Sequence, residues 1–96
     1  MPTYLMLMSA TEAGRSKISE IGTRYDAFKK QLKKSGGRLV GAYGLLGSYD
    51  YCAIVELPSE KDLLRLSLAI AERGSSRAQT YRAFAMDEFC AVAKDL

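Results

Sequence analysis

The segment Gly47-Ser48-Tyr49-Asp50-Tyr51 places the most reactive side chains of this sequence between two apolar runs. Asp50 is the last charged residue before Glu56, so its carboxylate stands alone at the start of an apolar stretch. A carboxylate withdrawn from water there can act as a general base or contact a ligand cation. The favoured interpretation is structural: Gly47 permits a hairpin, and Asp50 accepts hydrogen bonds from backbone groups near Gly47-Ser48.

Tyrosines are the second candidate group, because they are spread over every segment that we expect to be a strand. With Asp50, four of them form the candidate ligand-binding set: Tyr4, Tyr43, Tyr49 and Tyr51. Their hydroxyls could orient a small molecule in a pocket between helices and sheet, or in a pocket across a subunit interface. The alternative is that these rings, with Tyr81, are core or interface aromatics whose hydroxyls find local partners. No catalytic residue is assigned.

The residue types that are missing narrow the chemistry further. The chain has no histidine, which excludes Ser-His and Cys-His nucleophiles, a His-ligated haem and nearly every catalytic zinc site. Cys52 and Cys90 lack the spacing of a metal site, and their apolar neighbours predict two buried, reduced thiols. There is no glycine-rich dinucleotide loop and no P-loop. We therefore expect no cofactor and no metal.

The charge and hydropathy of the sequence indicate which partners the protein has and where in the cell it lies. The formal net charge is +3, with a basic cluster comprising Lys29, Lys30, Lys33, Lys34 and Arg38. This cluster is best interpreted as a solvated end of a helix, because no RNA-binding signature accompanies it. The apolar run 4–8 is too short for a signal peptide or a membrane span. We expect a cytoplasmic protein with no nucleic-acid or membrane partner.

The 96 residues suffice for one domain, residues 1–96, with one core. Apolar runs and turn residues predict strands over 3–8, 38–46, 49–57 and 77–84, with Gly47-Ser48 turning the second into the third. Apolar stripes predict a helix over 11–35, a helix from a Ser59 cap to Gly74, and a last helix after Asp87. The first helix is interrupted, and Thr23 with Asp26 predicts that its main part begins near residue 23.

This order of elements predicts an α+β, ferredoxin-like βαββαβ fold with an additional C-terminal helix. Right-handed crossovers then give a four-stranded antiparallel sheet of order 4-1-3-2, with both helices on one face. The two central strands, 3–8 and 49–57, are apolar on both faces. Since the helices cover one face only, we expect a second copy of the chain to cover the other.

The start Met1-Pro2-Thr3-Tyr4 and the hairpin Gly47-Ser48-Tyr49-Asp50-Tyr51 resemble the GYD family, named for its Gly-Tyr-Asp signature. The resemblance extends over roughly residues 2–90 and implies a stand-alone domain of the dimeric α+β barrel group. No biochemical role comes with it. One departure is Cys52-Ala53, where the family more often has branched aliphatic residues.

The same hairpin is similar to the ligand-binding module of leucine-responsive-type bacterial regulators, which has a βαββαβ fold and binds amino acids between subunits. This chain lacks the helix-turn-helix half of those regulators, so we do not expect it to act on DNA by itself.

These observations favour a small self-associating protein without enzymatic activity, which binds itself and could bind a small molecule at a sheet or interface pocket. The alternative is a cofactor-independent enzyme of the dimeric α+β barrel group, isomerase-like or monooxygenase-like, acting on a small aromatic or carbonyl compound. A carboxylate and a tyrosine hydroxyl meeting in a pocket would favour the enzyme.

Overall fold

The structure is a computed structural model that describes all residues, 1–96, and is built on one four-stranded sheet. The strands are β1 (Thr3–Ala10), β2 (Arg38–Gly44), β3 (Tyr51–Glu56) and β4 (Ser76–Ala83). Their order is β2-β3-β1-β4, and every neighbouring pair is antiparallel. This is the expected order 4-1-3-2 counted from the other edge, so the predicted fold class is confirmed.

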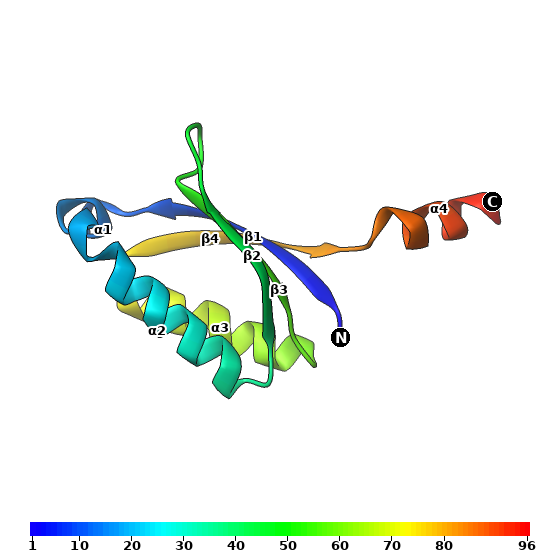
Figure 1. The fold of residues 1–96 in the computed structure, drawn as a ribbon, viewed down its shortest axis with the longest axis horizontal. Helices are drawn as coiled ribbons and strands as arrows, with labels where there is room; N and C mark the ends of the chain where they lie inside the picture. Colours follow the sequence, from blue (N-terminus) through cyan, green and yellow to red (C-terminus); the bar gives the residue numbers. More distant parts are fainter.

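Two long helices, α2 (Ile21–Lys34) and α3 (Glu60–Arg73), lie on the same face of the sheet (Figure 1). Two short helices precede α2: α1 (Glu12–Ser16) and a 3-10 turn, η1 (Ile18–Glu20). The last helix, α4 (Met86–Lys94), projects beyond the end of β4 and away from the rest of the fold (Figure 1).

The core lies between the sheet and the two long helices. Strand register places Tyr4 opposite Val55 and Met6 opposite Ala53, and all four side chains are buried. The helices and the end of β3 contribute the remaining core residues, which are Phe28, Leu32, Leu57, Leu66 and Ile70. Only 11 of 96 residues are buried, and many large apolar side chains remain exposed.

We call the face of the sheet opposite α2 and α3 the open face. Because side chains alternate along a strand, Leu5, Leu7 and Ile54 point to this face. Tyr81 pairs with Leu5 and Tyr43 pairs with Cys52, so both tyrosines lie on the open face as well. No helix of the chain covers these residues (Figure 1).

The α4 helix is uncovered along its whole length. Every residue from Phe84 to Leu96 is exposed, including the apolar side chains of Phe89 and Val92. This corrects the prediction of two buried thiols: Cys90 is exposed because α4 packs against nothing in the chain, and Cys52 is half-buried. The radius of gyration is 14.5 Å, whereas a compact chain of this length has about 12–13 Å.

The predicted boundaries were wrong at the start of α2 and in the hairpin. The α2 helix begins at Ile21, and no side-chain hydrogen bond caps it. The preceding 3-10 turn satisfies the first backbone donor of α2 instead, because Ile21 N–H donates to the Ile18 carbonyl, so a Thr23–Asp26 capping box is not needed. The strands of the hairpin are also shorter than 38–46 and 49–57, because residues 45–50 form a loop around Gly47.

Candidate functional site

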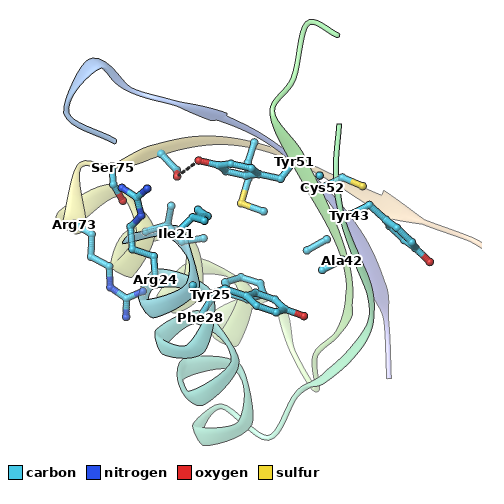
Figure 2. A pocket seen from close by; sticks show the side chains of 16 residues that line it. Ile21, Arg24, Tyr25, Phe28, Ala42, Tyr43, Tyr51, Cys52, Arg73 and Ser75 are labelled. Carbon is cyan, nitrogen blue, oxygen red and sulfur yellow. Dashed lines mark hydrogen bonds between the residues drawn. The ribbon is translucent and has the colours of Figure 1, made fainter. Parts of the chain in front are cut away.

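A cavity of about 320 Å³ lies between α2 and the β2–β3 side of the sheet (Figure 2). Phe28, Tyr25 and Ile21 of α2 form one wall, and Ala42 and Ala53 of the sheet face them. Small-molecule sites in proteins begin at about this volume and are mostly apolar with a few convergent polar groups. The cavity is thus the candidate functional site.

Of the predicted ligand-binding tyrosines, Tyr51 and Tyr43 line this cavity. Tyr51 pairs with Met8, which puts its ring on the helix-covered face, and its hydroxyl lies 3.5 Å from Ser76 Oγ (Figure 2). The Tyr43 ring instead points away from α2 and lies over Gly41 on the open face, 61% exposed. Tyr51 is therefore the one predicted tyrosine whose hydroxyl points into the cavity.

The other predicted site residues lie elsewhere. Tyr4 is a core residue, 3% exposed. Tyr49 donates a hydrogen bond of 2.5 Å to Gln79 Oε1, and Tyr81 bonds the same oxygen at 3.1 Å. Register places Tyr4 and Tyr81 on opposite faces of the sheet, so they share no site.

Asp50 also lies outside the cavity. Its Oδ2 accepts a hydrogen bond of 2.7 Å from the backbone N–H of Ala10, the last residue of β1. Its own N–H donates to the Met8 carbonyl at 2.9 Å. The expected structural bond of the Asp50 carboxylate is present, but its donor belongs to β1 rather than to the Gly47-Ser48 turn.

Two arginines that no sequence motif marks contribute the positive charge of the cavity. Arg24 of α2 and Arg73, the last residue of α3, lie near each other at one end of it (Figure 2). Arg24 Nη2 donates long hydrogen bonds to the carbonyls of Gly14 (3.3 Å) and Lys17 (3.4 Å), while Arg24 Nε is buried without a partner. Arg73 takes part in none of the three ion pairs.

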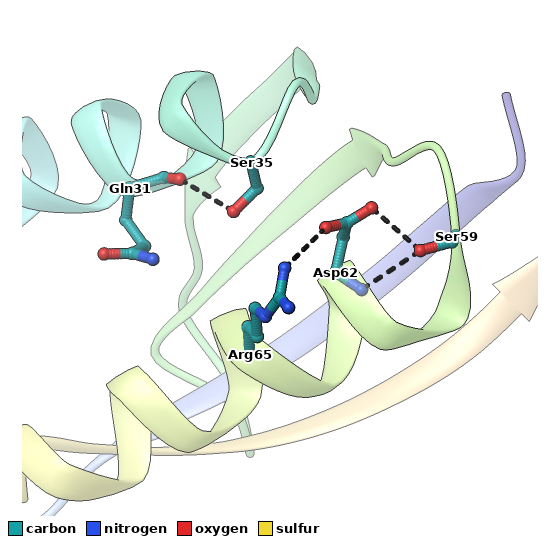
Figure 3. A network of polar contacts seen from close by, with 5 residues as sticks. All are labelled: Gln31, Ser35, Ser59, Asp62 and Arg65. Atoms are coloured by element: carbon teal, nitrogen blue, oxygen red, sulfur yellow. Dashed lines mark hydrogen bonds and ion pairs between the residues drawn. The ribbon is translucent and has the colours of Figure 1, made fainter.

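The capping residues at the two ends of α3 determine where the helix starts and ends, and therefore where Arg73 lies. Ser59 caps the helix, since Ser59 Oγ accepts from Asp62 N–H at 3.3 Å and donates to Asp62 Oδ2 at 2.8 Å (Figure 3). Gly74, with φ of +72°, then ends the helix in the left-handed conformation. Arg73 is consequently held at the edge of the cavity, beside the start of β4.

A close backbone contact holds the segment that bonds Arg24. A Cβ atom at Gly14 would lie 2.0 Å from the Ser75 carbonyl oxygen, and Thr11 N–H donates to that oxygen at 3.0 Å. This contact fixes α1 against the turn before β4, and with it the Gly14 carbonyl that Arg24 bonds.

The chain is similar to known proteins over nearly its whole length. The family model described as GYD domain matches residues 4–93. The chain belongs to this family. A curated relative from Thermus thermophilus is 30% identical over 95 residues, which is 98% of this chain and the whole of the relative. That relative of the GYD protein is named "Glutamine synthetase and cystathionine beta-lyase binding protein".

Two further observations concern partners. None of the helices is both long and apolar enough to span a membrane. No three residues among the cysteines, aspartates and glutamates of the GYD protein gather into a group that could hold a metal ion.

Proposed function

We propose that this GYD protein is a non-catalytic binding protein that associates with itself and with metabolic enzymes of the kind named for its relative. The relative's name supports a protein-binding role, and its similarity covers nearly the whole of this chain. The single structural observation behind the proposal is the amount of apolar surface that the chain leaves uncovered, and it supports self-association, whereas the enzyme-binding part rests on the name of the relative.

The uncovered surface is large in absolute terms. The accessible surface of the chain is 6782 Å², whereas a compact monomer of 10.6 kDa exposes about 5,500 Å². The excess of roughly 1,300 Å² exceeds the ~800 Å² that each partner buries in a standard protein–protein interface. Exposed large apolar side chains include Phe89 and Val92 of α4 and Tyr43 and Tyr81 of the open face.

A second copy of the chain is the proposed occupant of both surfaces. Two open faces can pack sheet against sheet, with Leu5, Leu7 and Ile54 at the centre. The projecting α4 would then lie against the partner copy and bury Phe89 and Val92. Its first turn carries Asp87 and Glu88, which complement the Arg77 side chain that each open face carries without an acidic partner.

The position of Asp50 weighs against the enzyme alternative. That alternative needs a carboxylate beside a tyrosine hydroxyl in a pocket, but the Asp50 carboxylate bonds the Ala10 N–H outside the cavity. None of the residues lining the cavity is an aspartate or a glutamate.

The binding role is tested with purified glutamine synthetase and purified cystathionine β-lyase from the organism that encodes the chain. With the GYD protein immobilised, we expect saturable binding of at least one enzyme, with a Kd in the micromolar range or tighter. An unrelated oligomeric enzyme of similar size and charge is the control. Absence of saturable binding to both enzymes, or equal binding of the control, would contradict the proposal.

A further inference from the structure

The polar groups of the cavity carry one charge sign only. Among its 16 lining residues are Arg24 and Arg73, with no aspartate and no glutamate to neutralise them. The acidic side chains nearest in sequence do not compensate: Asp26 pairs with Lys29 at 3.5 Å, and Glu72 forms no ion pair. An apolar cavity with two uncompensated guanidinium groups favours an anion.

The hydrogen-bonding capacity of these arginines is incompletely used. The buried Arg24 Nε has no partner, and the two bonds from Arg24 Nη2 are at the long end of the range. Buried donors in native proteins are almost always satisfied, so an orphaned one at a cavity is a place for a ligand acceptor. Arg73 has all of its donors free of protein partners and reaches the same end of the cavity (Figure 2).

The rest of the cavity suits an apolar body. Tyr25, Phe28 and Ile21 line it on the helix side, and Ala42 and Ala53 leave room on the sheet side (Figure 2). The Tyr51 hydroxyl lies 3.5 Å from Ser76 Oγ, a distance too long for a strong O–H···O bond, so both hydroxyls remain able to bind a ligand oxygen.

We propose that this cavity binds an organic carboxylate with an aromatic or branched aliphatic body. The carboxylate lies between the Arg24 and Arg73 guanidinium groups, whose forked donors match its two oxygens. The body lies along Phe28 and Tyr25. A free amino acid is a poorer ligand, because the lining offers no carboxylate to its ammonium group. This site is independent of the surfaces proposed for protein binding.

Matched small probes test the charge requirement by calorimetry on the full chain. 3-Phenylpropionate should bind at least tenfold more tightly than 3-phenylpropanol or 3-phenylpropylamine, since one charge-assisted bond is worth about a factor of ten. Phenylalanine should bind at least tenfold more weakly than 3-phenylpropionate. Equal binding of the acid, alcohol and amine, or no heat from the acid at about 10 mM, would overturn the proposal. If inorganic phosphate bound with the same Kd as 3-phenylpropionate, the ligand would not need an apolar body, and that part of the proposal would be wrong.

Two variants test the arginine assignment. Arg73 is exposed and bonds nothing in the protein, so Arg73→Gln should leave the fold intact and weaken 3-phenylpropionate at least tenfold. Lys61→Gln removes the same charge from the exposed surface of α3, outside the cavity, and is the control, with affinity expected to change less than twofold. Arg24→Gln should also weaken binding tenfold, provided that circular dichroism shows an unchanged fold. Equal affinities for Arg73→Gln and Lys61→Gln would overturn the proposal.

Discussion

The Asp50 carboxylate accepts a hydrogen bond of 2.7 Å from the backbone N–H of Ala10, forty residues earlier in the chain. Ala10 is the last residue of β1, and β3 begins directly after Asp50. The bond therefore closes the end of the central strand pair, where the regular β1–β3 ladder stops at Met8 and Tyr51.

Replacing Asp50 tests this bond. Asp50→Ala leaves the N–H of the buried Ala10 without its acceptor, and we expect the free energy of unfolding to fall by about 1–2 kcal/mol. Asp50→Asn retains an acceptor oxygen and should lose less than half of that. Thermal or urea unfolding of both variants measures the difference. Two wild-type melting curves would show that the bond contributes nothing to stability.

The contact of Gly14 with Ser75 makes a second prediction. Since a Cβ atom would lie 2.0 Å from the Ser75 carbonyl oxygen, Gly14→Ala must displace α1 and should cost about 1–3 kcal/mol. Gly22→Ala is the matched control within α2, because nothing lies within 4 Å of its added Cβ atom. It should be neutral or stabilising by up to about 1 kcal/mol, owing to the helix propensity of alanine. Similar urea midpoints for the two variants would refute the close contact.

Two adjacent residues of β1, Leu5 and Met6, point to opposite faces of the sheet, so their substitution tests the open face and the core separately. Met6 is fully buried, so Met6→Lys places an unpaired charge in the core and should unfold the chain. Leu5 points to the open face, where Leu5→Lys should preserve the circular dichroism spectrum but release monomers. A Leu5→Lys protein that is folded and still self-associated would contradict the assignment of the open face as an interface.

The exposed helix makes a fourth prediction. Val92→Asp places a charge on the apolar face of α4 and should weaken self-association at least tenfold, measured by analytical ultracentrifugation. Ala91→Asp is the control and should associate like the wild type, because Ala91 lies about 100° around the helix from Val92 and about 160° from Phe89. Equal dissociation constants for the two variants would show that α4 does not contact a second copy.

The sequence predicted the fold well because its signals were local and strong. Ser59 and Gly74 mark the ends of α3, and apolar runs mark the two central strands. The predicted boundaries were wrong where a helix begins without a capping side chain. The α2 helix, for example, continues from a 3-10 turn and does not begin at a Thr23 cap. The predicted burial of Cys90 failed because an amphipathic pattern shows that a helix has an apolar face without showing whether its own chain covers that face.

The site was predicted only in part, because it depends on three-dimensional proximity between distant segments. Tyr51 was found through its tyrosine-rich hairpin, but the register that separates it from Tyr43 and Tyr4 cannot be read from residue types. Arg24 and Arg73 are 49 positions apart, and they meet only because α2 and α3 lie on the same face of the sheet. Neither lies in a motif, so no local signal marked them.

The central claim is that the uncovered open face and α4 of this GYD protein are interfaces, and the molar mass in solution tests it most directly. Size-exclusion chromatography with light scattering at micromolar concentration should give at least about 21 kDa, twice the chain mass of 10.6 kDa. A mass of 10.6 kDa, unchanged as the protein concentration rises, would contradict the account.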